Sequence, residues 1–213
     1  MRLLISLLLL VTLYAFTDNQ IYSEIVKSTV VVETNKKKSA GVIINAKGHV
    51  ITNYHALAGS LDVFISLHDS DIAPYKASII KVDKTKDLAL IQIESDSYFD
   101  FINISKIPLE VGDSAFIVGH PNNYDWSFQR VFVSKFIEDH LWSYDSYELM
   151  ESDIYQLQVT FNPGNSGGPL INNNGNLVGL NTFSAELNSG VGFSITSKEI
   201  FDFLRTNLEE ASQ

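Results

Sequence analysis

The sequence contains no cysteine among its 213 residues, so it can form neither a disulfide bond nor a thiolate metal site. Exported domains in oxidising compartments often depend on disulfides for stability. A chain that is exported without them must be stabilised by its core alone. If this chain is exported, the absence therefore favours a bacterial periplasmic or secreted protein over an extracellular animal one.

Positive charge is also scarce. Fifteen Lys and Arg residues are outnumbered by 25 Asp and Glu residues, giving a formal net charge of −10 at pH 7. This acidity argues against nucleic acid or anionic lipid as a main partner. The one basic cluster, the three lysines at 36–38, is explained better by a solvated loop than by a binding patch. His140 lies near Glu138, Asp139 and Asp145 without metal-ligand spacing, so no metal or cofactor is expected.

No apolar run reaches the roughly 20 residues that a membrane-spanning helix needs. Residues 3–16, which follow Met1-Arg2, form an uncharged and leucine-rich run. This pattern predicts a secretory signal peptide over residues 1–17, with Ala15 and Thr17 as small residues near a cleavage point. A buried N-terminal helix and an uncleaved signal anchor are the alternatives, and the anchor would attach the protein to a membrane.

Helical periodicity is nearly absent until the end of the chain. From Ile21 onward, short runs rich in Val, Ile and Phe alternate with polar or glycine turns, which predicts an all-β protein. The predicted strands are residues 29–33, 40–45, 50–52, 62–67, 76–82, 88–93, 114–118, 130–136, 155–161, 170–172, 177–182 and 192–195, with hairpin turns at 46–48 and 173–175. Closure removes exposed strand edges, so this number of short strands favours two closed or nearly closed antiparallel units.

The sequence also predicts where the two units and the closing helix begin and end. Residues 103–112, with Pro108 and Gly112, are the predicted link between the halves. The capping-box spacing of residues 196–199, followed by apolar residues at every fourth position, predicts one closing helix. The predicted division is a signal over 1–17, an N-terminal unit over 18–107, a C-terminal unit over 108–197 and a helix over 198–213.

The most informative stretch is Phe161-Asn162-Pro163-Gly164-Asn165-Ser166-Gly167-Gly168-Pro169-Leu170, where one serine lies among glycines between apolar segments. We interpret Ser166 as a nucleophile, which needs a base for its proton and backbone N–H donors for the oxyanion. Gly164 can turn its own N–H and that of Ser166 toward one point, while Gly167 and Gly168 would keep side chains away from a substrate. The alternative is a surface turn between two strands.

Two further residues fit the roles of base and orienting acid. His55 follows a predicted strand end in Thr52-Asn53-Tyr54-His55, where an imidazole can lean into a cleft. Asp87 opens the apolar strand Asp87-Leu88-Ala89-Leu90, where a buried carboxylate is costly unless a partner such as an imidazole accepts its charge. Read alone, His55 could be a packed histidine and Asp87 a residue that caps a turn.

These three motifs, in the order His, Asp, Ser, resemble the catalytic motifs of trypsin-like serine proteases, and most closely the HtrA (Deg) branch. The resemblance spans roughly residues 30–197 and includes 178–182 and 190–195. It implies two antiparallel six-stranded β-barrels with the site between them. Ser166 would attack a peptide carbonyl, His55 would act as base and then acid, and Asp87 would orient His55.

The resemblance also implies further site residues. The backbone N–H groups of Gly164 and Ser166, with that of Asn165 nearby, would form the oxyanion hole. By family alignment, the uncharged residues Thr160, Thr182, Phe183, Ser184 and Gly190 would line the specificity pocket. We therefore predict a small or medium apolar residue before the scissile bond rather than lysine or arginine.

The sequence departs from the family pattern in several ways. Asn165 stands where proteases activated by cleavage carry aspartate, so no such activation is inferred. Phe132 replaces a usual glycine, and only 18 residues follow Ile195, so the chain resembles the protease domain without a PDZ domain. The aromatic region 138–150, predicted as a long loop, is either locally packed or an activation or substrate-contacting loop.

The expected partners are protein or peptide substrates. A homo-oligomer such as the trimers common in the HtrA branch is compatible with the sequence. The leading hypothesis is an exported serine endopeptidase that cleaves unfolded or flexible segments. The alternatives are a peptide-binding or chaperone-like protein on a protease scaffold, and a latent protease that needs a partner.

Overall fold

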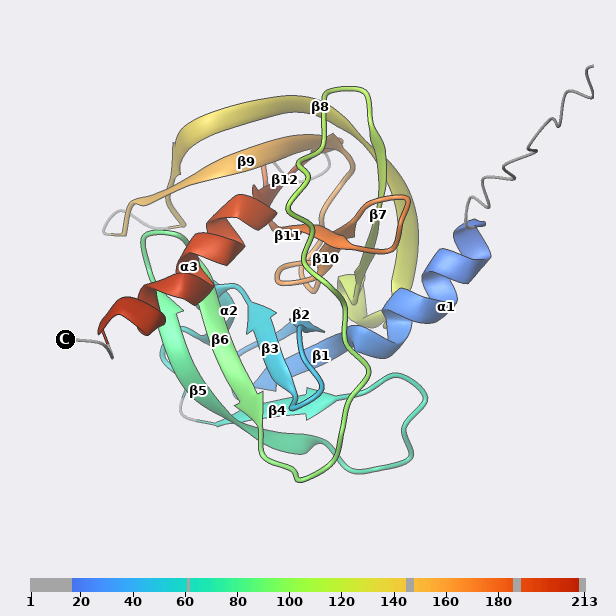
Figure 1. Ribbon diagram of the computed structural model, residues 1–213, viewed down its shortest axis with the longest axis vertical. Helices are drawn as coiled ribbons and strands as arrows, with labels where there is room; N and C mark the ends of the chain where they lie inside the picture. The colour runs from blue at the N-terminus through green and yellow to red at the C-terminus, as the bar shows by residue number, and fades with distance from the viewer. Residues whose placement is uncertain (1–16, 61, 145–147, 186–188, 211–213) are drawn as a thin grey trace, which may run out of the picture.

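Two β-barrels make up most of the molecule. The computed structural model describes residues 17–60, 62–144, 148–185 and 189–210, and residues 1–16 of the predicted signal lie outside them. Twelve strands in this part form two closed antiparallel barrels of six strands each (Figure 1). The all-β class, the two six-stranded barrels and the C-terminal helix are confirmed.

The first barrel has the strand order β1-β2-β3-β6-β5-β4. Its strands are β1 (Thr29–Thr34), β2 (Lys38–Ile43), β3 (His49–Thr52), β4 (Val63–Ser66), β5 (Tyr75–Asp83) and β6 (Leu88–Ile93). The barrel closes where β1 pairs with both β2 and β4, so that Val31 lies opposite Ala40 on one side and Ser66 on the other. Side chains that alternate inward, such as Val30 and Val32, fill its core.

The second barrel has the strand order β10-β11-β12-β9-β8-β7. Its strands are β7 (Ser114–Gly119), β8 (Ser127–Trp142), β9 (Met150–Gln158), β10 (Pro169–Ile171), β11 (Leu177–Ser184) and β12 (Val191–Thr196). The prediction of a loop over 138–150 is wrong for its first part, because β8 continues to Trp142 and pairs there with Met150. His140 and Leu141 pair in the same way with Ser152 and Glu151, so residues 138–142 extend the hairpin.

The two longest helices lie at the ends of the described chain. Helix α1 (Asp18–Ser28) was not predicted; it has a capping box between Thr17 and Gln20, and it buries Ile21 and Ile25. Its apolar face is only two turns long, which gave little periodicity to detect. Helix α3 (Ser197–Glu210) was predicted. No helix among the described residues is long and apolar enough to cross a membrane.

Helix α3 lies across the junction of the two barrels (Figure 1). It buries Ile200 and Phe203 against the core that contains strands of the second barrel. It also reaches the first barrel, since Lys86 Nζ lies 3.3 Å from Glu199 Oε2. The helix therefore contacts both barrels.

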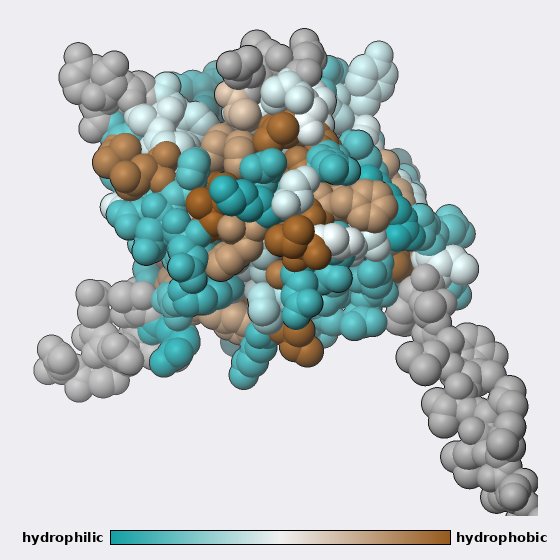
Figure 2. Space-filling model, turned by 90° about the horizontal axis from the view of Figure 1, so that it is seen from above, coloured by the Kyte–Doolittle hydropathy of each residue, from teal (hydrophilic) through white to brown (hydrophobic). Residues whose placement is uncertain are grey.

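The outer face of the second barrel is mixed in polarity. Exposed apolar side chains on and beside β8 include Phe132, Phe136, Leu141 and Leu149. The view from above shows apolar side chains distributed among hydrophilic ones (Figure 2). Phe132, which departs from the family pattern, is thus an exposed residue of β8.

Candidate active site

His55 is carried by the short helix α2 (Tyr54–Leu57), directly after β3. Two bonds to one carbonyl hold this turn, because Asn53 Nδ2 and the Tyr54 N–H donate to the backbone oxygen of Asp87 at 3.1 and 3.2 Å. Asp87 itself has φ 55°, a left-handed conformation that aspartate tolerates better than most residues. The backbone of Asp87 therefore positions the turn that carries His55, independently of the contact between the His55 and Asp87 side chains.

The side chains of His55 and Asp87 form a direct pair. His55 Nδ1 lies 2.8 Å from Asp87 Oδ2 and 3.1 Å from Oδ1, and the His55 backbone N–H donates to Oδ1 at 2.9 Å. The Asp87 carboxylate is fully buried, while the His55 side chain is 14% exposed. A carboxylate beside Nδ1 selects the tautomer with the proton on Nδ1 and leaves Nε2 free to accept a proton.

Thr182 of β11 links this pair to Ser166. Its Oγ1 donates to Asp87 Oδ2 at 2.8 Å, and its carbonyl oxygen accepts from Ser166 Oγ at 3.0 Å. The structure therefore brings His55, Asp87 and Ser166, from both barrels, around one residue. In the part of the chain that the structure describes, no hydrogen bond joins Ser166 Oγ to the His55 imidazole.

The loop that carries Ser166 packs closely against both barrels. The Ala40 N–H of β2 donates to the Ser166 carbonyl at 2.8 Å. A Cβ at Gly167, which has φ 80°, would meet Ala40 O at 2.2 Å, and one at Gly168 would meet Val118 O at 2.3 Å. The expectation that these two glycines clear space for a substrate is therefore wrong. They allow the protein's own backbones to approach closely.

The predicted oxyanion donors divide into two groups. Gly164 has φ 105°, and a Cβ there would meet His120 O at 2.1 Å, so this position requires glycine. Among the described residues, the N–H groups of Gly164 and Ser166 donate to no protein acceptor, whereas the Asn165 N–H donates to Asn162 O at 3.0 Å. Asn165 is thus the one predicted donor whose N–H is already engaged.

The predicted pocket residues do not all lie in one place. Ser184 Oγ donates to Phe161 O at 3.3 Å, and the Val159 N–H donates to Gly190 O at 3.0 Å, so both lie against the segment that contains Thr160. Thr182 instead turns its hydroxyl to Asp87. Phe183 stacks with other rings, as described next.

Phe183 belongs to a stack of near-parallel aromatic rings. Its ring centroid lies 5.0 Å from that of Trp142, 4.6 Å from Phe193 and 5.9 Å from His140. Burial lowers the pKa of His140 below its ordinary value, as expected for a neutral imidazole among aromatic rings. His140 therefore lies in a packing cluster next to the site.

Tyr144 reaches the site from the connection between β8 and β9. Its ring centroid lies 4.3 Å from that of His55, and its hydroxyl lies 3.2 Å from Asp87 Oδ2 and 3.0 Å from Thr182 Oγ1. Burial of the hydroxyl, reinforced by the negative charge of Asp87, holds the pKa of Tyr144 well above its usual value. The phenol is therefore neutral and keeps its proton.

No local sequence pattern indicates these contacts of Thr182 and Tyr144. Thr182 was expected only in the pocket wall, and Tyr144 appeared only as one aromatic residue of region 138–150. The one available signal for Tyr144 was the aromatic enrichment of that region. Its contact with Asp87 joins residues 57 positions apart, which no local pattern reveals.

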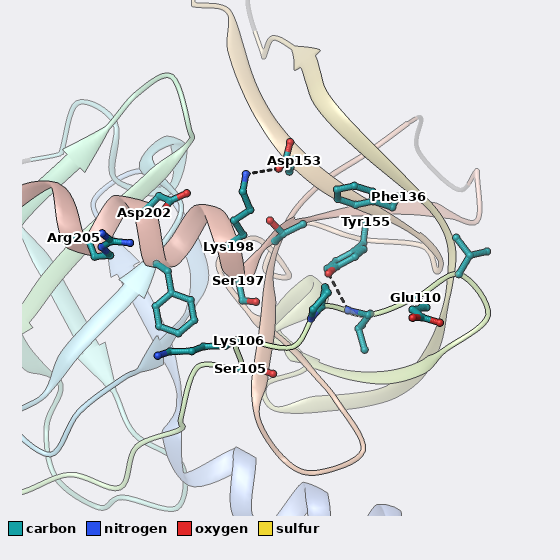
Figure 3. Close-up of a pocket in the computed structure, with 15 residues that line it drawn as sticks. Ser105, Lys106, Glu110, Phe136, Asp153, Tyr155, Ser197, Lys198, Asp202 and Arg205 are labelled. Carbon is teal, nitrogen blue, oxygen red and sulfur yellow. Dashed lines mark hydrogen bonds and ion pairs between the residues drawn. The ribbon is translucent and has the colours of Figure 1, made fainter.

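A cavity of about 1060 Å³ lies apart from these residues (Figure 3). The linker, β9 and α3 line it, and Lys198 pairs there with Asp153 at 2.8 Å. Tyr155 OH accepts from the Leu109 N–H at 3.0 Å in the same wall. None of the predicted site residues lines this cavity.

His120 supports the loop of Ser166 from the second barrel. Its imidazole is buried, with Nδ1 accepting from the Trp126 N–H and Nε2 donating to Val30 O, both at 3.1 Å. Its backbone N–H donates to Gly164 O at 3.1 Å. Burial lowers the pKa of His120 from 6.5 to about 4, against the opposing effects of Val30 O and Asp125.

We expect His120 to make the protein less stable in acid. Above pH 6.5 the imidazole is neutral in both states, whereas between 6.5 and about 4 the unfolded chain binds the proton more readily than the folded one. The free energy of unfolding should therefore fall as the pH falls across this window, by about 3 kcal/mol in total. Urea unfolding at several pH values measures this slope.

The matched control is His120→Gln, whose neutral amide can accept from Trp126 and donate to Val30 at every pH. This variant should lose most of the slope whatever its stability at pH 7. Identical slopes in the two proteins would contradict the assignment of the effect to His120.

The chain is similar to known serine proteases. A family model described as the trypsin-like peptidase domain matches residues 39–180. The chain is similar to Protease Do-like 1, chloroplastic, of Arabidopsis thaliana, with 30% identity over 174 residues, which cover 78% of this chain and 38% of that protein. It is similar to the probable periplasmic serine protease do/HhoA-like of Haemophilus influenzae, with 33% identity over 175 residues, which cover 80% and 36%. The chain thus spans less than two fifths of the length of these relatives.

Solved structures show the same architecture. The active form of the Rv3671c protease from M. tuberculosis has a TM-score of 0.79 and 23% identity, covering 88% of this chain and 83% of that chain. The HtrA-type protease AlgWS227A, solved with a tripeptide, has a TM-score of 0.79 and 25% identity, covering 92% of this chain and 65% of that chain. The first of these likenesses concerns the fold alone.

Proposed function

Because the chain belongs to the trypsin-like peptidase domain family, we propose that it is a serine endopeptidase with Ser166 as nucleophile, His55 as base and Asp87 as the orienting acid. The resemblance to HtrA/Deg-type proteases is confirmed by the curated relatives. The observation that carries the proposal is the buried His55–Asp87 pair, which Thr182 connects to Ser166.

The proposed reaction proceeds through an acyl-enzyme. Ser166 Oγ attacks the peptide carbonyl carbon while His55 Nε2 takes the hydroxyl proton, and Asp87 stabilises the resulting imidazolium. The N–H groups of Gly164 and Ser166, which donate to no acceptor among the described residues, stabilise the oxyanion. His55 then gives its proton to the leaving amine, and a water molecule, activated by His55, hydrolyses the ester and restores Ser166.

A second candidate is a latent or catalytically silent form that binds peptides. It is favoured by one observation, the hydrogen bond from Ser166 Oγ to Thr182 O. A serine hydroxyl can move between staggered rotamers, and the proposed mechanism requires the rotamer that presents it to His55. We propose that this orientation is a resting state.

The proposed substrates are unfolded or flexible protein segments. The protein is proposed to act on them after export.

A fluorophosphonate, which reacts only with an activated serine, tests this proposal. We expect covalent labelling of Ser166, identified by mass spectrometry, and no labelling of the Ser166→Ala variant. Labelling that requires denatured casein would assign the resting protein to the latent form. Binding of denatured casein without labelling of Ser166 under either condition would instead support the binding protein and contradict the endopeptidase.

A further inference from the structure

The contact of Tyr144 with the His55–Asp87 pair is not part of the triad mechanism. The ring and the hydroxyl contact different members of the pair: the ring packs on His55 with an interplanar angle of 43°, while the hydroxyl lies at Asp87 Oδ2. The Tyr144 residue is 45% exposed, while its hydroxyl contacts the fully buried Asp87 carboxylate. Tyr144 thus stands between solvent and the pair.

The Asp87 carboxylate needs hydrogen-bond donors. It is fully buried, and a buried carboxylate is costly unless donors replace the water that it has lost. Oδ1 accepts from the His55 backbone N–H, and Oδ2 is approached by His55 Nδ1, Thr182 Oγ1 and Tyr144 OH at 2.8, 2.8 and 3.2 Å. The phenol of Tyr144 is therefore one of three groups around the oxygen nearest the imidazole.

The orientation of these donors matters for proton transfer. Oδ2 must remain in line with His55 Nδ1 when the imidazole becomes charged, and a donor network that surrounds Oδ2 limits its rotation. The ring of Tyr144 also covers one face of His55 and so excludes water from the pair, which strengthens the hydrogen bonds within it. Both effects act on His55 through its surroundings.

We propose that Tyr144 is a positioning residue for the His55–Asp87 pair, with its hydroxyl restraining Asp87 Oδ2 and its ring shielding His55. This inference rests on the proposed function. It assigns a role in the reaction to a residue of the connection between β8 and β9.

Two variants separate the hydroxyl from the ring. Tyr144→Phe keeps the ring and removes one hydrogen bond to a charged group, so we expect kcat to fall about tenfold with little change in KM. Tyr144→Ala removes both contacts and should lower kcat further. Controls are Tyr98→Phe, at a tyrosine 87% exposed, and Leu149→Ala, at an exposed residue of the same connection; both should retain the wild-type kcat.

A spectroscopic measurement does not depend on turnover. The proton shared by His55 Nδ1 and Asp87 should give a low-field proton NMR signal, which Asp87→Asn would abolish. We expect Tyr144→Phe to move or broaden this signal, whereas Tyr98→Phe should leave it unchanged. A role limited to folding would lower the melting temperature without this change.

The outcomes distinguish the two proposals. Tyr144→Phe with unchanged kcat and an unchanged NMR signal would overturn the positioning role while wild-type labelling of Ser166 still supported the endopeptidase. Faster turnover by Tyr144→Ala would also overturn it, because the ring would then obstruct the cleft. If the wild type neither cleaves nor is labelled, the endopeptidase fails, and the NMR comparison alone decides the role of Tyr144.

Discussion

The Ser166→Ala variant should lose nearly all peptidase activity, with kcat about 10⁴- to 10⁶-fold below that of the wild type. Removing Oγ removes the atom that forms the acyl-enzyme, so His55 and Asp87 have no hydroxyl to activate. Among the described residues, the Oγ of Ser166 makes a single hydrogen bond, to Thr182 O at 3.0 Å. We therefore expect the free energy of unfolding to change by only about 1 kcal/mol.

Steady-state cleavage of denatured casein and thermal unfolding measure the two effects in the same preparation. Ser127→Ala is the matched control, because Ser127 Oγ also donates to a backbone carbonyl, that of Tyr124, at 2.8 Å. That variant should keep its activity. A Ser166→Ala protein as active as the wild type would show that the nucleophile lies elsewhere.

The Asp87→Asn variant should show the second largest loss, with kcat lowered about 10⁴-fold. The substitution would present an amide group to a site built from donors, namely His55 Nδ1 and the hydroxyls of Thr182 and Tyr144. The imidazole would then favour the tautomer with its proton on Nε2, which cannot accept the proton of Ser166. The neutral amide would also fail to stabilise the imidazolium.

The backbone should tolerate this change. Asp87 has φ 55°, and asparagine adopts the left-handed region at least as readily as aspartate. Asp69→Asn is the control, because Asp69 also has a positive φ of 48° and lies 3.2 Å from His68 Nδ1, but its side chain is 87% exposed. Loss of activity in both variants would indicate a general effect of charge and contradict the specific role of Asp87.

The sequence predicted the strands better than the helices. β1 and β6 are short apolar runs bounded by polar residues, and each buries four consecutive residues, so both could be located from the run itself. Helix α1 offered Ile21 and Ile25 within two turns and was missed. Residues 138–142 were predicted as part of a loop because their pairing partners in β9, such as Met150 opposite Trp142, lie beyond the turn.

The candidate residues came from the sequence, whereas their arrangement came from the structure. His55, Asp87 and Ser166 were selected because each stands in a motif with its own local chemistry. The bond from Ser166 Oγ to Thr182 O and the position of the Tyr144 hydroxyl depend on contacts between residues 16 and 57 positions apart. Side-chain rotamers follow from the surrounding packing, which local patterns do not encode.

The sequence by itself determined the β class, the family resemblance and the identity of the residues proposed for catalysis, because short apolar runs, turn residues and motif chemistry are local properties. Only the tertiary structure decided that Gly167 and Gly168 serve close packing within the protein, that the Asn165 N–H is engaged, and that Tyr144 covers His55. These outcomes depend on which surfaces two closed barrels bring together, and therefore on contacts between distant parts of the chain.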